Sequence, residues 1–256
     1  MRSLASHLLL LLFFTSSAQV EKIVLNGNIY ILDFFDEFSD TEIDTEKWRF
    51  RTDSKHWSTQ LKRNVELKNG LLYLNLRKEK SLDKNYTGAG IISLDTFRYG
   101  YYETHLKIPN GKGWHTSFWL MKHNGYGNTD PSVAEIEIDI LENDSNNPNG
   151  YEIAFHKWMG EHVSVFGQYV PTPNMNINFV LVACEYTPDY VKYYMNGNEV
   201  KNLDISEVPK GSTNIWLTSI ASHLGGTSSV DDNKLPSNAI FDYVRYYKLE
   251  EIKHQQ

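Results

Sequence analysis

Period-two alternation of apolar and polar residues recurs along this chain in short segments bounded by turn signals. Residues 71–77 alternate after Asn69-Gly70, and residues 190–195 lead through Asn196-Gly197 into a second arm, as in a type I′ hairpin. After residue 20, no segment shows the period of a long amphipathic helix. Many short strands with turn signals every 8 to 12 residues or so predict an all-β sandwich or barrel.

The ends of the chain set the expected domain organisation. Arg2, the apolar run 8–14 and the small residues 15–18 predict a secretory signal peptide, residues 1–18, cleaved after Ala18. The alternative, a membrane anchor, is disfavoured because the run is too short to span a bilayer. No linker and no internal repeat divides the rest, so we expect one domain over residues 19–256. We expect a secreted protein, extracellular or periplasmic, with no membrane association after cleavage.

The amino-acid composition limits the kinds of molecule that the protein is expected to bind. The net charge is −7, and nucleic acid is a disfavoured partner because its phosphates require a basic face. Six Trp and sixteen Tyr suit a protein that stacks on the flat faces of sugar rings. The lone Cys184 excludes an intrachain disulfide, and we expect it to be a buried apolar residue. We expect a monomer.

The most informative strand alternates acid and isoleucine. Glu135, Glu137 and Asp139 fall on its open face. A strict period of two would send Glu142 inward, but a β-bulge around Ile140-Leu141 would return it to the acidic face. Like charges side by side on a sheet cost stability, so the arrangement implies either a function or a bound cation.

Three interpretations of this strand stay open from the pattern alone. Hydrolysis of a glycosidic bond needs two carboxyls, and Glu137 and Glu142 can form the pair, with Asp139 between them to hold a proton or orient a neighbour. On an extended strand these glutamates lie roughly 13 Å apart at Cα, whereas retaining chemistry needs carboxyls about 5 to 5.5 Å apart, so the side chains must lean together over a concave sheet. A calcium site and an ordinary solvated face are the alternatives.

The run Glu137-Ile138-Asp139-Ile140-Leu141-Glu142 resembles the signature of family 16 of the glycoside hydrolases. It has the bulged form, Glu-x-Asp-x-x-Glu, of laminarinases and agarases. Further segments match in the family's order and cover nearly the whole mature chain: 34–38 with 47–48, 69–74, 99–107, 113–120, 187–197 and 242–247.

The resemblance implies a β-jelly-roll sandwich of two curved antiparallel sheets with a concave substrate cleft, concanavalin A-like in fold. It implies retaining endo-hydrolysis of β-linked polysaccharides, with Glu137 as nucleophile, Glu142 as general acid/base and Asp139 as the assisting carboxylate. No cofactor is required for this chemistry. Glu135 stays outside it, either lining the cleft or bonding a neighbouring strand.

Four aromatic or imidazole side chains are predicted to bind substrate. Trp114 and Trp119 resemble cleft-floor positions, but their odd separation puts them on opposite faces of a regular strand, so one of them should be core. His156 resembles a sugar-contacting histidine of the family, and Trp158 lies on the same strand.

The resemblance also implies a structural calcium ion on the convex side. Glu37, Gly70 and Asp242 match its usual places, and hard oxygen ligands suit Ca²⁺. The alternative is that these are ordinary surface residues.

The expected partner is a polysaccharide, with a β-1,3- or mixed-linked glucan first and an agar- or carrageenan-type galactan second. Sulfated galactans would favour Lys or Arg beside the cleft. Lys157 is the only basic residue placed there by the pattern, which tilts the expectation towards neutral glucans. The rival functions are a non-catalytic carbohydrate-binding jelly roll and a transglycosylase that remodels cell-wall glucans.

Overall fold

The computed structural model describes residues 21–122 and 135–250, and the predicted signal peptide, residues 1–18, lies outside them. The described chain is built from β-strands, with three short 3₁₀ helices: η1 (Lys62–Asn64), η2 (Leu224–Gly226) and η3 (Asp232–Lys234). In these residues no helix is long and apolar enough to cross a membrane.

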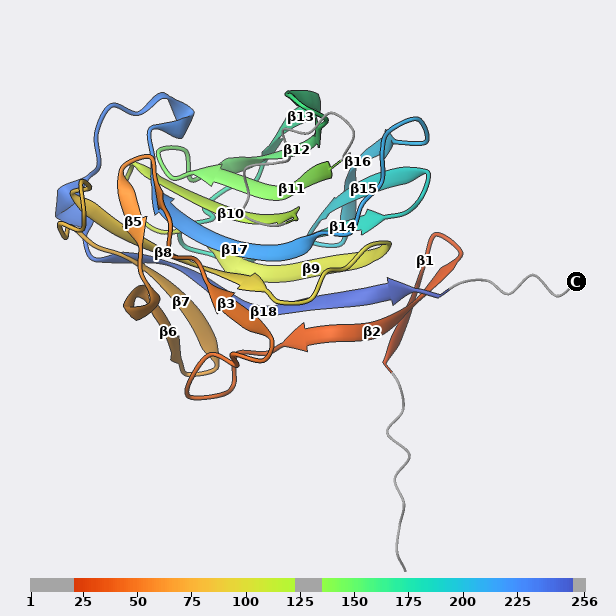
Figure 1. The fold of residues 1–256 in the computed structure, drawn as a ribbon, viewed down its shortest axis with the longest axis horizontal. Helices are drawn as coiled ribbons and strands as arrows, with labels where there is room; N and C mark the ends of the chain where they lie inside the picture. Colours follow the sequence, from red (N-terminus) through yellow and green to blue (C-terminus); the bar gives the residue numbers. More distant parts are fainter. Residues whose placement is uncertain (1–20, 123–134, 251–256) are drawn as a thin grey trace, which may run out of the picture.

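The strands form two sheets (Figure 1). The first sheet has the order β1 (Lys22–Leu25), β2 (Asn28–Asp36), β18 (Ser237–Leu249), β9 (Gly100–Lys107), β14 (Val180–Tyr186), β15 (Tyr190–Met195) and β16 (Asn198–Asp204), and β18 also pairs with the hairpin of β7 (Leu71–Leu76) and β6 (Val65–Lys68).

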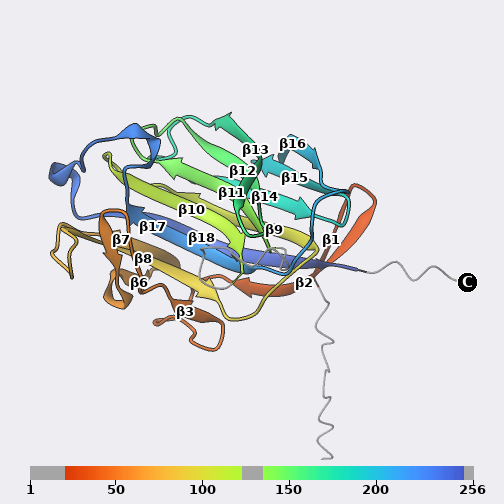
Figure 2. The ribbon, with the colours of Figure 1, turned by 45° about the horizontal axis from the view of Figure 1, so that its top comes forward.

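The second sheet has the order β13 (His162–Pro171), β12 (Gly150–Trp158), β11 (Glu135–Asp144), β10 (Trp114–Met121), β17 (Asn214–Ala221), β8 (Tyr86–Ser93), β5 (Ser58–Gln60) and β4 (Ser54–Lys55), with β3 (Trp48–Phe50) on β8. The β5–β8 pair is parallel. The long strands of both sheets curve together, as Figures 1 and 2 show. This confirms the predicted jelly-roll sandwich.

The core lies between the two sheets. Ile136 and Ile138 of β11 pack into it with Phe118 of β10 and Leu72 of β7, and all four are at most 1% exposed. Burial of such side chains contributes about 1.5 to 3 kcal/mol each. Cys184 is fully buried in the same core, as predicted. The acidic residues that alternate with these isoleucines therefore face away from the core.

A β-bulge interrupts the pairing of β10 with β11. Phe118 stands opposite Leu141, whereas Trp119 stands opposite Asp139, so Ile140 is the extra residue. Ile140 and Leu141 are both buried in the inter-sheet core. The predicted bulge is confirmed, and it changes which residues of β11 face outward beyond this point.

A smaller cluster covers the opposite face of the first sheet, around the buried carboxylate of Glu185 on β14. The β1–β2 hairpin and β15 supply its hydrogen-bond donors. These are Tyr30, Tyr190 (2.8 Å), Tyr194 (3.0 Å), Asn26 (2.6 Å) and Asn28 (3.3 Å). The cluster ties the amino-terminal hairpin to the sandwich on the side away from the acidic strand.

Candidate active site

The outer face of the second sheet holds a small cavity of about 60 Å³. Glu137 and Glu142, both from β11, line it together, because the bulge at Ile140 returns Glu142 to the face of Glu137. The other lining residues are Arg51, Lys55, His56, His115, Ser117, Trp119, Thr218, Ile220 and Leu224. The structure thus brings the two predicted catalytic glutamates to one space.

Glu137 is oriented by the strand next to its own. Trp158 of β12 donates its indole N–H to Oε2 of Glu137 at 2.8 Å. Burial raises the pKa of Glu137 to about 7, with the indole hydrogen bond opposing the rise and the charge of Glu142 adding to it. Once Glu137 has lost its proton, its carboxylate is poorly hydrated because it is buried. A poorly hydrated carboxylate is suited to act as a nucleophile.

Asp139 is 1% exposed and lies between the glutamates along the strand. Its Oδ2 is 3.1 Å from Nε2 of His156, whereas its buried Oδ1 has no hydrogen-bond partner within residues 21–122 and 135–250. Burial raises its pKa well above the ordinary value, and the charges of Glu142 and Glu137 raise it further. Burial and the two neighbouring carboxylates thus favour the protonated form of Asp139.

Glu142 has a basic neighbour that the sequence analysis did not name. Nε2 of His115 on β10 lies 3.0 Å from Oε1 of Glu142, and Nδ1 of the same ring lies 3.0 Å from Oδ1 of Asp144. Burial raises the pKa of Glu142, but the hydrogen bond and charge of His115 outweigh it, so the net shift is downward. The same two carboxylates overcome the effect of burial on His115 and raise its pKa to about 9.

Of the predicted substrate-binding residues, Trp119 lines the cavity. Its ring centroid lies 4.6 Å from that of Trp216 on β17, a residue that the sequence analysis missed. His156 and Trp158 share the acidic face, where each contacts a predicted catalytic carboxyl group. Trp114 is corrected: it is 1% exposed and packs with Leu76, so it has no free face for a sugar ring.

The basic residues of the site also differ from expectation. Lys157 stands opposite Ile136, on the core-facing side of β12, and is therefore not the cleft cation that the pattern predicted. Lys55, the last residue of the short strand β4, lines the cavity instead, together with Arg51. Arg51 is already paired with Asp53 at 2.7 Å. These residues lie in a segment without alternation, so no local signal placed them at the site.

Two of the three residues predicted to hold calcium have carboxylates that lie beside basic side chains. The carboxylate of Glu37 pairs with Arg245 at 2.8 Å, and that of Asp242 lies 2.9 Å from Nδ1 of His105. Gly70 is in the β6–β7 turn. Within residues 21–122 and 135–250, no group of three or more His, Cys, Asp or Glu side chains is placed to hold a metal ion. The calcium site stays a prediction.

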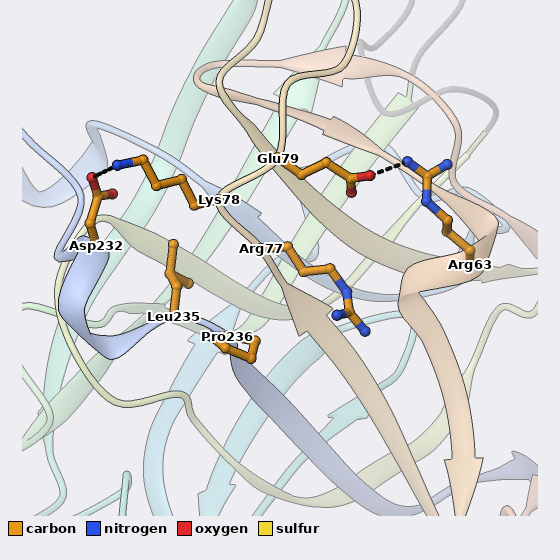
Figure 3. A pocket seen from close by; sticks show the side chains of 7 residues that line it. All are labelled: Arg63, Arg77, Lys78, Glu79, Asp232, Leu235 and Pro236. Carbon is orange, nitrogen blue, oxygen red and sulfur yellow. Dashed lines mark hydrogen bonds and ion pairs between the residues drawn. The ribbon is translucent and has the colours of Figure 1, made fainter.

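A larger cavity, of about 630 Å³, shares no lining residue with the site cavity (Figure 3). Its charged groups pair with one another: Lys78 with Asp232 at 2.6 Å and Arg63 with Glu79 at 2.6 Å. Its two carboxylates, Glu79 and Asp232, are each bound to a cation from their own side of the cavity, so its greater volume does not make it the catalytic centre.

Two glutamates that face one space on a curled β-sandwich, with proton affinities shifted in opposite directions, define a glycosidase that hydrolyses O-glycosyl bonds. The family model of the glycosyl hydrolases family 16 matches the sequence over residues 51–226, and the chain belongs to this family. Its members act with retention, which agrees with the double displacement predicted from the sequence.

Individual relatives are distant. The beta-glucanase of Rhodothermus marinus is 23% identical over 239 residues, which cover 83% of each chain. Beta-porphyranase D of Zobellia galactanivorans is 30% identical over 129 residues, covering 43% of this chain and 29% of its own. The chain spans only 48% and 52% of two further beta-glucanases. The endo-beta-1,3-glucanase of Pyrococcus furiosus shares the fold, with a TM-score of 0.78 at 22% identity over 90% of this chain and 98% of that one.

Proposed function

We propose that this protein is a secreted, retaining endo-glycosidase that cleaves internal bonds of a β-1,3- or mixed-linked β-glucan. The observation that carries the chemistry is that Glu137 and Glu142 face one cavity from a single bulged strand. The β-glucan is supported by the name of the Rhodothermus marinus relative, a beta-glucanase. Secretion is supported by the residue pattern of positions 1–18.

In the first step, Glu137 attacks the anomeric carbon and the glycosidic C–O bond breaks. A proton passes through Glu142 to the leaving oxygen. Water then attacks the glycosyl-enzyme, with Glu142 as the base. Burial and the charges of the two glutamates raise the pKa of Asp139, which disfavours a third negative charge beside the nucleophile.

Substrate binding is assigned to the side chains beside the two glutamates. Trp119 lines the cavity, and its ring packs against that of Trp216. Trp158 and His156 border the carboxyl groups on the β12 side, where a sugar ring bound at the reacting bond would meet them. These contacts would hold the polysaccharide along the curled outer face of the second sheet.

A sulfated galactan of the agar or carrageenan type is the second candidate. One specific observation favours it: Lys55, not Lys157, is the lysine that lines the cavity with Glu137 and Glu142. An ammonium group there would pair with a sulfate ester of the substrate. The partial similarity to beta-porphyranase D points the same way.

The test is reducing-sugar release from laminarin, lichenan, agarose, porphyran and κ-carrageenan. Wild type, Glu137→Ala and the control Glu207→Gln, an exposed glutamate away from the cavity, would be run together. We expect activity on laminarin or lichenan that the first variant loses and the second keeps. A folded wild type without activity on any polymer contradicts the proposal.

Lys55→Met separates the two substrate candidates. On a neutral glucan we expect this variant to keep most of its activity, whereas a sulfate-recognising site would lose porphyran or carrageenan cleavage selectively. The lengths of products at high substrate concentration distinguish hydrolysis from transglycosylation, because a transglycosylase would also form products longer than the substrate.

A further inference from the structure

His115 occupies an unusual position between two carboxylates. In the register of β10 with β11 it stands directly opposite Asp144, while Glu142 is its diagonal neighbour. Both ring nitrogens are used: Nε2 lies 3.0 Å from Glu142 and Nδ1 lies 3.0 Å from Asp144. The residue is only 7% exposed. The imidazole therefore bridges the predicted acid/base residue and a second acid.

The hydrogen-bond chemistry of this bridge requires an additional proton. A carboxylate only accepts hydrogen bonds, and a neutral imidazole has a single N–H to donate. His115 can satisfy Glu142 and Asp144 together only as the imidazolium, or as a neutral ring with one of the carboxyls protonated. The trio thus holds one proton more than a neutral histidine between two carboxylates.

Other titratable groups around His115 do not offset the two carboxylates. Glu142 and Asp144 come from β11, and the opposite neighbour on β17 is the apolar Ile220. Burial lowers the pKa of His56 to about 4, aided by Lys55, so His56 faces His115 as a neutral ring. The more distant ionisable groups that bear on this cluster are Lys55, Arg51, His156, His223, Glu137 and Asp139.

Asp144 is itself held in place. A Cβ atom built on Gly225 of η2 would lie 2.6 Å from Cβ of Asp144, and the φ of Gly225 is +73°. Only glycine lets the η2 turn approach so closely in this conformation. The turn therefore limits how far Asp144 can move from the ring of His115.

We propose that His115 is a positioning residue that stores the proton used by Glu142, and that Asp144 holds the imidazole in place for this purpose. The inference rests on the proposed function, because it concerns the acid/base step of that reaction. It resolves the mismatch between the predicted role of Glu142 and its lowered proton affinity. Glu142 and His115 share one titrating proton, so the pair and not the carboxyl alone is the acid.

The proton balance closes over both steps. In the first step, Glu137 forms a bond to the anomeric carbon and the leaving oxygen takes one proton from the Glu142–His115 pair. His115 is then neutral and still donates its Nδ1 proton to Asp144. In the second step, water forms the new bond, the bond to Glu137 breaks, and the proton of the water returns to the pair. No other reactant is needed.

The test is the pH dependence of kcat/KM for wild type and His115→Gln, which keeps a polar side chain that cannot titrate in this range. We expect the basic limb to lie near pH 9 in the wild type, since it follows the proton of the pair. In the variant it should move down by at least about one pH unit, and kcat at pH 8 should fall at least about tenfold with KM little changed. A basic limb that stays in place overturns the proposal.

Two further variants separate the proton role from a structural one. His105→Gln removes a histidine of a matched His–Asp pair on the first sheet, and its profile should equal that of the wild type. Asp144→Asn keeps the side-chain shape without the charge, so we expect a smaller downward shift of the basic limb. This variant supplies the test if His115→Gln does not fold.

A dinitrophenyl β-glycoside of an oligosaccharide from the cleaved polymer provides the last discrimination. Its leaving group needs no proton, so His115→Gln should release dinitrophenolate about as fast as the wild type, although its cleavage of natural chains is impaired. Equal loss on both substrates means a structural role and contradicts the proposal.

If the wild type cleaves none of the polymers, the proposed function fails, and NMR titration of His115 decides the present inference. An imidazolium with both N–H groups at pH 8 supports the stored proton. A ring that is neutral at pH 8 while Glu142 and Asp144 are both ionised overturns it.

Discussion

Trp158 donates its indole N–H to Oε2 of Glu137 at 2.8 Å, so the nucleophile is oriented by the strand that runs beside its own. This hydrogen bond favours the ionised form of Glu137 and lowers its pKa against the larger effect of burial. The donor is a side chain that also borders the reacting centre, so binding and nucleophile activation depend on one residue.

Trp158→Phe should therefore raise the pKa of Glu137. Hydrogen bonds to charged groups contribute about 1.5 to 3 kcal/mol, so we expect the acidic limb of kcat/KM to move up by about one pH unit. The measurement is the pH profile of kcat/KM on the most active polymer. Met159→Leu, an exposed neighbour, is the control. An unchanged acidic limb would mean that the indole N–H does not act on the ionised nucleophile.

The roles of the two glutamates can be separated by the anomer that azide forms. In Glu137→Ala, azide should attack from the nucleophile's side and give the α-glycosyl azide. In Glu142→Ala, an activated glycoside should still form the glycosyl-enzyme, and azide should then give the β-glycosyl azide. Anomeric coupling constants identify the product. If the anomers are exchanged between the variants, the roles of Glu137 and Glu142 are exchanged too.

His115 should make the stability of the protein depend on pH. Its pKa in the folded state is about 9, above the ordinary value of 6.5, so its stabilisation is complete below about pH 6.5 and is lost as the pH rises through about 9. Between those limits the free energy of unfolding of the wild type should fall by about 3 kcal/mol more than that of His115→Gln. Urea unfolding across this range measures the difference, and parallel curves for the two proteins would contradict it.

Glu185 should matter for stability and not for catalysis. Its buried carboxylate accepts hydrogen bonds from tyrosines and asparagines that tie the β1–β2 hairpin to the first sheet. Glu185→Gln places an NH₂ group among these donors, so we expect a loss of about 3 kcal/mol in unfolding free energy. The activity per folded molecule should be unchanged. The control is Glu199→Gln, at a more exposed ion pair on β16; equal destabilisation by both changes would contradict this account.

Removal of divalent cations should leave the protein intact. Because Glu37 is paired with Arg245 and Asp242 with His105, the predicted calcium ligands are already engaged by basic groups. We expect the melting temperature in excess EDTA to match that in calcium. A rise in melting temperature with added calcium would instead support the predicted calcium site and would require both carboxylates to leave these partners.

Much of the acidic strand could be predicted because its signal is local. Alternation assigns Glu137 and Ile138 to opposite faces, and a buried alternative for Glu142 would be costly, which points to the bulge. His115 shares the parity of Trp119, so the same reasoning could have placed it on the cleft face. Lys157 lies between His156 and Trp158, and its parity already excluded it from their face.

The remaining parts of the site depend on contacts that no local pattern carries. Lys55 and His56 reach the glutamates from a segment about eighty residues earlier in the chain, across β8 and β17. Parity showed that Trp114 and Trp119 face opposite ways, but only the packing of Leu76 against Trp114 decides which of them is core. The pairing of Glu37 with Arg245 likewise brings together the two ends of the chain.

The extra residue in β11 has a consequence for how this site can be lost or gained. Ile140 shifts the parity of everything after it, so Glu142 and Asp144 both arrive on the cleft face while Asn143 turns inward, where it donates to the carbonyl oxygen of Gly150 at 2.6 Å. Deleting this one aliphatic residue would remove the bulge and turn Glu-x-Asp-x-x-Glu into Glu-x-Asp-x-Glu, a regular alternation that keeps Leu141 and Asn143 inward and both acids on the cleft face. A frame-preserving loss of this single codon would therefore leave both acids facing the cleft, whereas pairing the full-length strand without its bulge would turn the acid/base side of the enzyme into the core.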